Sequence, residues 1–448
     1  MGSLRSIASG VGLVALVVGA VFLTLSEPLA GVVVLLMAAF ALWAWIHPVT
    51  AASSLAFLTA AFPKAGVRIA DFPFPVFLFG LIIAVGIMFV SSRRAPHGPV
   101  VLVIVGAYLT FAIARTFIYT DDGPAGVFAF VAWAIIPVVL LTVSTSLAGV
   151  DQRFIRAFQW GFLLSAAFAL VQLAGGLEAT AIPGLTQALG DDITDKHNVI
   201  YVQGSENFSK IPSTYHNGNI YGLAAAFFLI FSATRVFAGK GTKLDFTTVI
   251  AAVLAIGLSG SRAAIVAAAI PLLILLLRRG SLRWRIAIVG LGAFIVAAVL
   301  SIEPELARRY TIDSIVASGG SGRVGIWERT LATMRPTDFL FGSDSRAVLP
   351  DGWVGIIIQL GLVGTALLAA AVVTLMLRRP EWRVTVLVLL IGAVVDSSYW
   401  TFPTWFIPAA MMAGRLVTLN DETPAPTPPM VRGRRGYQNV RVVRQGIP

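Results

Sequence analysis

The sequence has no cysteine and few charged residues of either sign. Without cysteine, no disulfide holds any of its loops, even in an oxidising compartment. Charged residues make up only 12% of the 448 residues, apolar residues make up 57%, and the mean hydropathy is +0.85. These values exclude an ordinary soluble domain. The sequence also lacks an internal repeat of about 20 to 50 residues and a visible likeness between its halves, both of which would have indicated other architectures.

Apolar segments long enough to cross a hydrocarbon core of ~30 Å recur almost to the C-terminus. Lipid offers no hydrogen-bonding partner to the backbone, so such segments must be helices. The sequence predicts an all-α polytopic membrane protein with about 12 to 14 transmembrane helices and long outer loops. The count is given as a range because four of the fourteen candidate spans are short for a full crossing. The candidate spans are residues 7–25, 29–46, 50–62, 73–91, 100–119, 126–147, 154–174, 218–237, 246–259, 263–277, 286–302, 353–377, 384–399 and 405–418.

Basic residues set the predicted orientation, because Lys and Arg in short loops stay on the cytoplasmic side. If the spans alternate, most of the 33 Lys and Arg residues and both termini are cytoplasmic, whereas most of the 22 Asp and Glu residues are outside. The formal net charge of +11 therefore follows from topology. It indicates contact with anionic membrane lipids and not with nucleic acid, for which no binding motif is present.

The predicted transmembrane domain covers residues 1–418. Its first span is expected to be retained, because it lacks a small-residue cleavage site followed by a soluble domain. Two polar stretches within the domain, 175–217 and 303–352, are too long for turns and are predicted to be outer loops that carry function. Residues 419–448 are rich in proline and then basic, which predicts a disordered cytoplasmic tail.

A polar break, Leu258-Ser-Gly-Ser-Arg262, interrupts the apolar stretch from Phe246 to Leu277 and predicts a hairpin. Its two helices would be only about 21 to 23 Å long, which would place Arg262 below the outer surface of the membrane. A guanidinium at that depth costs several kcal/mol unless it finds an anion, and its planar fork suits phosphate. In the alternative interpretation, Arg262 only reaches up to the headgroups or pairs with a carboxylate.

The segment Gly257-Leu-Ser-Gly-Ser-Arg-Ala-Ala264 resembles the Gly-Ser-Arg signature of the O-antigen ligase and polymerase superfamily of bacterial envelopes. Pro212–Asn219 resembles the family's segment upstream of that signature. Gly322-Arg-Val-Gly-Ile-Trp327 is similar to its Gly-Arg-x-x-x-Trp motif, and Gly361-Leu-Val-Gly364 to its following glycines. The matching pieces cover roughly residues 210 to 365. The resemblance implies a GT-C-like fold that transfers sugar chains from undecaprenyl diphosphate without a metal or other cofactor, with arginines holding the diphosphate.

The residues before the last of these motifs bear on the type of transfer. Asp351-Gly-Trp353 resembles the Asp-Ser-Gly-Tyr or Asp-Asn-x-Tyr form of polysaccharide polymerases, whereas the ligases have a His-Asn pair where this chain has Pro350-Asp351. The resemblance thus implies a polymerase of the bacterial inner membrane, alongside other polysaccharide assembly proteins. Ligase-type transfer to a separate acceptor stays an alternative. A lipid-linked oligosaccharide flippase or transporter is another, but it would bury its polar groups near the bilayer midplane.

Glycosyl transfer needs a stabilised leaving phosphate and an oriented acceptor hydroxyl. We expect Arg262 and Arg323 to bind the diphosphate and Asp351 to orient or deprotonate the hydroxyl. Each assignment has a structural alternative: Asp351 as a helix N-cap, and Arg323 as the end of a flexible glycine-rich hinge. The further candidates for substrate binding are Arg68, His216, Asn219 and Arg346. In the alternative interpretation, Arg68 pairs with Asp71 and His216 caps a helix.

Two acidic pairs, Asp121-Asp122 and Asp191-Asp192, raise the question of a metal. Neither pair lies in the first outer loop, where metal-dependent glycosyltransferases of related architecture carry theirs. Gly123 and Pro124 follow the first pair and favour a turn. The sequence therefore predicts no metal site.

Overall fold

The computed structural model describes most of the chain between residues 28 and 395. The described ranges are 28–69, 72–91, 98–117, 130–146, 152–189, 199–200, 208–215, 217–278, 323–343, 352–377 and 383–395, with the isolated residues 127, 286, 289, 290, 292, 293, 297 and 301. Most of these residues are helical, and the helices are α2 (Pro28–Ile46), α3 (Pro48–Ala61), α4 (Val76–Ser91), α5 (Pro99–Thr116), η2 (Val131–Ile135), α7 (Ile136–Ser146), α8 (Gln152–Gly175), α9 (Leu177–Thr180), η4 (Ser213–Tyr215), α10 (Gly218–Phe237), α11 (Lys243–Ser259), α12 (Arg262–Arg278), α16 (Arg323–Thr333), α17 (Pro336–Phe341), α18 (Gly352–Leu377) and α19 (Arg383–Val395).

Four of the described helices, α5, α8, α10 and α18, are long and apolar enough to cross a membrane, and α3 and α12 are shorter apolar helices. The predicted class, an all-α membrane protein, is therefore confirmed. Most predicted spans coincide with a helix to within a few residues, and α10 has the predicted bounds. The spans at 7–25 and 405–418 and most of 286–302 lie outside the described residues, so the count of 12 to 14 stays a prediction.

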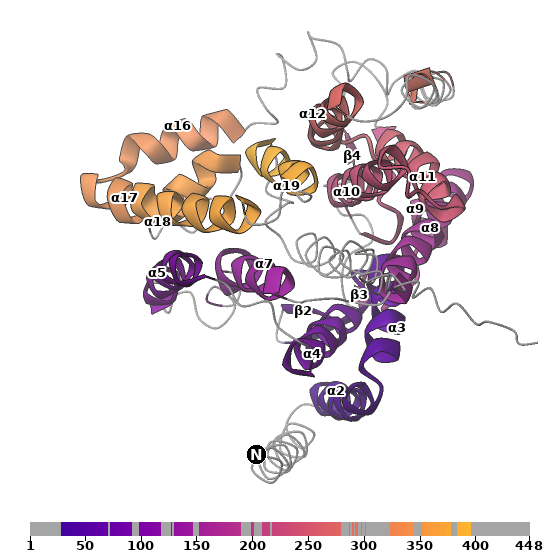
Figure 1. Cartoon of the computed structure of the whole chain (residues 1–448), viewed down its shortest axis with the longest axis horizontal. Helices are drawn as coiled ribbons and strands as arrows, with labels where there is room; N and C mark the ends of the chain where they lie inside the picture. The colour runs from indigo at the N-terminus through magenta and orange to yellow at the C-terminus, as the bar shows by residue number, and fades with distance from the viewer. Residues whose placement is uncertain are drawn as a thin grey trace, which may run out of the picture.

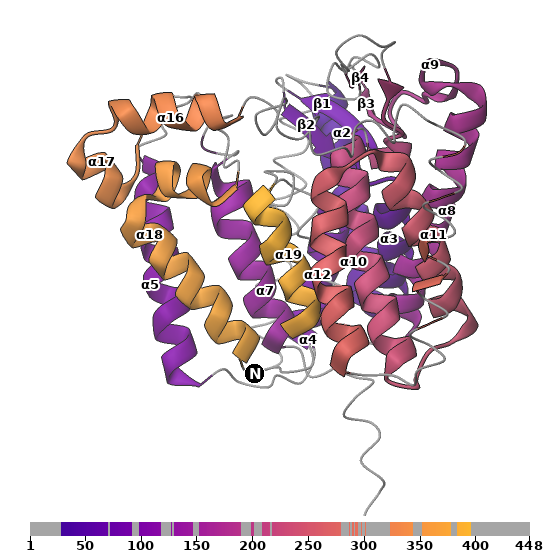
Figure 2. The ribbon, with the colours of Figure 1, turned by 90° about the horizontal axis from the view of Figure 1, so that it is seen from above.

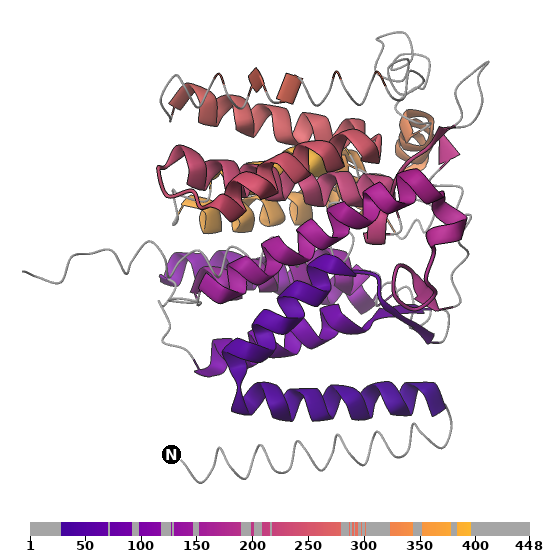
Figure 3. The same cartoon turned by 90° about the vertical axis from the view of Figure 1, so that its right-hand side faces the viewer.

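Helix α10 lies at the centre of the packing, against α8, α11, α12 and α19 (Figure 1). Nearly all of its side chains are buried, because it is apolar on every face and the small residues Ala224–Ala226 let neighbouring helices approach closely. Phe228 of α10 stacks on Phe162 of α8 with ring centroids 4.3 Å apart. At the edge of the bundle, α2 lies beside α3 and α4 (Figure 3). Helix α10 and the helices packed around it thus form the core of the structure, and this packing fixes where the ends of these helices lie.

One end of the helix bundle carries the short elements of the structure. Helices α9, α16 and α17 and strands β1 (Gly66–Ile69), β2 (Phe72–Pro75), β3 (Ala188–Leu189) and β4 (Val199–Ile200) all lie at this end (Figure 2). We call it the capped end. Strand β5 (Phe208–Ser209) pairs with β4, so the residues just before α10 belong to the capped end as well. The N-terminus of α10 is therefore here, and its C-terminus lies at the opposite end.

The strands were not predicted, and one of them corrects a predicted span. Strand β2 pairs antiparallel with β1, which also pairs in parallel with β3. Residues 73–75 of β2 were expected to begin the span 73–91, but α4 begins at Val76. Pro73 and Pro75 have no N–H group to donate within a helix, so the backbone stays extended.

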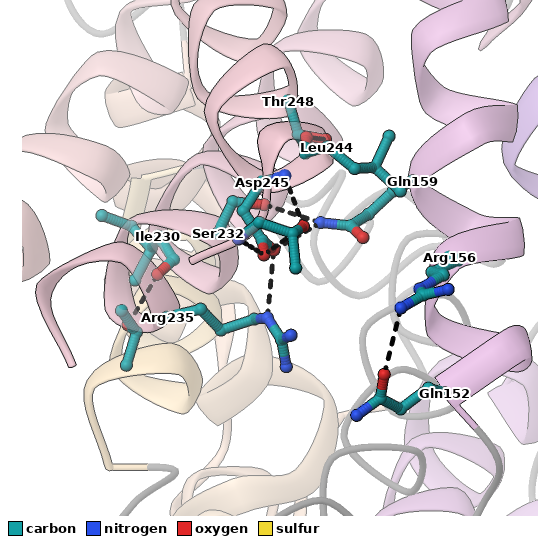
Figure 4. Close-up of polar contacts among 11 residues, drawn as sticks. Gln152, Arg156, Gln159, Ile230, Ser232, Arg235, Leu244, Asp245 and Thr248 are labelled. Atoms are coloured by element: carbon teal, nitrogen blue, oxygen red, sulfur yellow. Dashed lines mark hydrogen bonds and ion pairs between the residues drawn. The ribbon is translucent and has the colours of Figure 1, made fainter. Parts of the chain in front are cut away.

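A buried polar network joins three helices at the opposite end of the bundle (Figure 4). Asp245 of α11 accepts hydrogen bonds from Gln159 Nε2 of α8 at 2.8 Å and from Arg235 Nε of α10 at 3.0 Å. Its second oxygen accepts from the backbone N–H and the hydroxyl of Thr242, both at 2.8 Å. Asp245 N donates back to Thr242 Oγ1 at 3.3 Å, which completes a capping box. Both carboxylate oxygens of Asp245 are therefore occupied, as a buried charge requires.

Candidate active site

The turn from Leu258 to Arg262 connects α11 to α12 at the capped end, where the polar break predicted a hairpin. Gly260 adopts φ 59° and ψ 20°, a left-handed conformation that glycine reaches without the steric cost of a Cβ atom. Ser259 Oγ donates to Ile256 O at 2.7 Å and accepts from Ser261 N at 3.2 Å. Ser261 Oγ then accepts from Ala264 N at 3.3 Å and so caps the helix that begins at Arg262.

A second segment lies against this turn. Ile211 N donates to Leu258 O at 3.2 Å, which attaches the chain before α10 to the hairpin. The neighbouring Lys210 is only 7% exposed, and its Nζ donates to Asn219 Oδ1 in the first turn of α10 at 3.1 Å. The structure therefore brings a buried ammonium group to the end of the hairpin. This charge is expensive to bury unless polar groups or anions surround it.

The absence of a side chain at Gly218 allows this close packing. A Cβ atom there would lie 2.7 Å from both Lys210 Cβ and Ser259 O. Asn217 precedes the helix and caps it, because its Oδ1 accepts from Asn219 N at 2.7 Å. The stem of Lys210, the start of α10 and the hairpin turn thus form one compact unit.

The unit concentrates positive charge. Helices α10 and α12 pack against each other, and both direct their N-termini towards the capped end. An N-terminus carries the positive end of the helix dipole and suits an anion. Arg262 occupies the first position of α12, half-buried, with its Nε enclosed by protein. Two cationic side chains and two helix dipoles therefore favour the same ligand chemistry, a polyatomic anion such as phosphate.

Buried polar groups on α8 support the segment that carries Lys210. Ser213 Oγ donates to Ser165 O at 2.6 Å, and Gln172 Nε2 donates to Ser213 O at 3.0 Å. These bonds hold Ser213 at φ 54°, which is uncommon for a residue other than glycine. Tyr215 OH donates to Ala60 O of α3 at 3.1 Å, and burial raises the pKa of this phenol, so it stays a donor.

The sequence predictions divide into those that the structure describes and those that it does not. Arg262 and Asn219 come together at adjoining helix ends. Arg323 is the first residue of α16, a helix that packs against α18. The structure describes the backbone of Arg323 but not its side chain. Arg68 lies in β1, where its backbone faces Pro73. His216, Arg346, Asp351 and both acidic pairs lie outside the described residues.

Lys210 was missed from the sequence. It stands in a polar stretch that was predicted to be an outer loop, where a lysine is ordinarily solvated, and no local pattern marks it. The one available signal was its position two residues before the segment Pro212–Asn219, which was singled out by resemblance. Among the described residues, no group of three or more His, Asp or Glu side chains is arranged to hold a metal ion.

Comparison with protein-family models, with curated proteins and with solved structures found no match to this chain.

Proposed function

We propose that this protein is a glycosyltransferase of the bacterial inner membrane, with both termini cytoplasmic and the capped end outside. It would polymerise oligosaccharide units linked to undecaprenyl diphosphate into an envelope polysaccharide. The observation that carries the proposal is that two cationic side chains lie at the N-terminal ends of two adjoining helices: buried Lys210 donates to Asn219 in the first turn of α10, and half-buried Arg262 is the first residue of α12. A diphosphate attached to a lipid would present its charge at this depth, where a freely soluble anion would be poorly solvated.

The transfer requires charge stabilisation on one side of the reacting carbon and a base on the other. An acceptor hydroxyl oxygen forms a bond to the anomeric carbon, while the bond from that carbon to the diphosphate oxygen breaks. The diphosphate leaves with the electron pair, and Lys210, Arg262 and the helix dipoles stabilise its developing charge. The hydroxyl proton passes to a base, for which Asp351 is the candidate. Arg323 is a candidate for a second contact to the diphosphate.

The test uses purified protein in lipid nanodiscs with an undecaprenyl-diphosphate oligosaccharide, and products are resolved by length. We expect a ladder of longer chains, and a loss of product of about 100-fold or more in Arg262→Gln and Lys210→Met. Lys240→Met is the matched control, because Lys240 is an exposed lysine in the loop between α10 and α11 at the opposite end. It should retain full activity. Each variant must elute as a monodisperse species with an unchanged melting temperature.

Other products would distinguish the alternatives. Transfer only to a separate lipid or glycan acceptor would favour the ligase. Movement of the oligosaccharide across the bilayer of sealed vesicles without a new glycosidic bond would favour a flippase or transporter. Activity of Arg262→Gln equal to that of the wild type would refute the proposed site.

A further inference from the structure

Helix α18 is broken at its tenth residue, and the break receives the end of α17. Gly361 has φ 67° and ψ 178°, which lies outside the helical region. Two carbonyl groups just before the break accept hydrogen bonds from other elements. Ile358 O accepts from Ser343 N at 2.7 Å, and Gln359 O accepts from Arg115 Nη2 at 3.2 Å. Arg115 Nη2 also donates to Ser343 O at 3.0 Å.

These bonds set the level of α17 relative to the spanning helices. Arg115 is in the last turn of α5, one of the helices that can cross a membrane. Because Arg115 Nη2 contacts Ser343, two residues after α17, and Gln359, just before the break in α18, both of these segments lie at the height at which α5 ends. A Cβ atom at Gly361 would collide with the backbone of Leu340 and Gly342, so the approach of α17 is close.

Helices α16 and α17 are oriented differently from the bundle. Figure 2 shows α16 lying across the direction of α5 and α7, at the capped end and beside α18. Helix α17 ends in three large apolar side chains, all exposed: Phe339, Leu340 (46%) and Phe341 (51%). Leu331 of α16 is exposed too. A soluble surface does not ordinarily present so many large apolar side chains in one place.

The spanning helices α5 and α18, which α17 approaches, expose large apolar side chains as well. Phe117, two residues after Arg115, is 71% exposed, and Leu362 and Val363 are exposed immediately beyond the break in α18. Further along α5, Val103 and Ile113 are exposed as well. Side chains of this kind on a spanning helix face lipid. The apolar end of α17 therefore lies next to spanning helices whose exposed side chains are also apolar.

We propose that the α16–α17 segment lies in the bilayer interface at the capped end, with Leu340 and Phe341 inserted at the boundary between headgroups and acyl chains. Arg335, which immediately precedes α17 and pairs with Asp338 at 3.5 Å, is 81% exposed and would lie at the level of the lipid phosphates. Apolar insertion together with a basic residue is the pattern of an interfacial helix. The role of the break in α18 is to hold this anchor at a fixed height. This inference goes beyond the proposed enzymatic function and does not depend on it.

Site-directed spin labelling tests the proposal directly, because the chain has no native cysteine to remove. Leu340→Cys and Phe341→Cys, each labelled with a nitroxide, are reconstituted in nanodiscs of phosphatidylethanolamine and phosphatidylglycerol. Glu328→Cys, at an exposed polar position of α16, is the matched control. Collision of each nitroxide with oxygen, which concentrates in lipid, is compared with collision with a water-soluble nickel chelate.

We expect the ratio of oxygen to nickel accessibility to be at least several-fold higher at 340 and 341 than at 328. Nickel accessibility at 340 and 341 equal to that at 328 would place α17 in water and overturn the proposal. Shielding from both reagents would mean that a second copy or another protein covers the surface, which would overturn it as well. No glycan substrate enters the measurement, so its outcome is independent of the enzymatic assay.

Discussion

Replacing Asp245 by asparagine tests whether the buried network at the end opposite the candidate site is needed for stability. The substitution keeps the shape of the side chain but removes its charge and converts one acceptor into a donor. All the groups around Asp245 donate: Gln159 Nε2, Arg235 Nε, and the backbone N–H and hydroxyl of Thr242. Whichever way the amide is turned, its NH₂ group faces at least one donor.

The magnitude follows from burial. Breaking a buried ion pair costs about 3 to 5 kcal/mol, because it leaves the other charge uncompensated. Two effects reduce this cost. Arg235 is 15% exposed, so water hydrates its guanidinium in part, and the oxygen of the new amide still accepts a hydrogen bond. We therefore expect a loss of about 2 to 4 kcal/mol in the free energy of unfolding.

Asp338→Asn is the matched control. Like Asp245, Asp338 accepts a hydrogen bond from the backbone N–H of the residue preceding its helix and pairs with an arginine, here at 3.5 Å. That partner, Arg335, is almost fully exposed, so the loss should be at most about 1 kcal/mol. Thermal unfolding in dodecyl maltoside, followed by loss of the monodisperse species, compares the variants. Equal melting temperatures for Asp245→Asn and the wild type, or equal decreases in both variants, would refute the reasoning.

Three further substitutions probe the packing, each measured by the same thermal unfolding assay. Gly361→Ala should lower the free energy of unfolding by about 3 kcal/mol or more, because alanine is strained at the φ and ψ of this position and the new methyl group would meet the backbone at the end of α17. Gly106→Ala is the control, because the space around Gly106 is open, and it should change the melting temperature little. Gly161→Ala should destabilise by about 2 kcal/mol or more, because its methyl group would press on the backbone of α3, and an unchanged melting temperature would contradict this contact. Tyr215→Phe should cost about 1 kcal/mol through the lost hydrogen bond to α3, and no decrease would mean that the bond contributes nothing.

The sequence alone determined the class of the protein and the position of most of its helices. Partition between water and lipid depends on the transfer free energy of successive side chains, which is a local property of the chain. The start of α10 at Gly218 was predicted from a polar residue that precedes an apolar run. The hairpin turn at Leu258–Arg262 was predicted from a Gly-Ser break within another apolar run. The extended segment at Pro73 and Pro75 was equally local, but the apolar character of its phenylalanines concealed it.

Only the tertiary structure decided which distant residues meet. Nothing near Lys210 in the chain shows that it is buried beside the turn at Ser259. Nothing near Arg115 shows that it bonds to Ser343, just after α17, and to Gln359, just before the break in α18. These contacts depend on how whole helices pack, on the space that Gly218 and Gly361 leave for a neighbouring backbone, and on which carbonyl groups a broken helix frees. Packing is the collective result of many weak contacts between segments, so no short stretch of sequence encodes it.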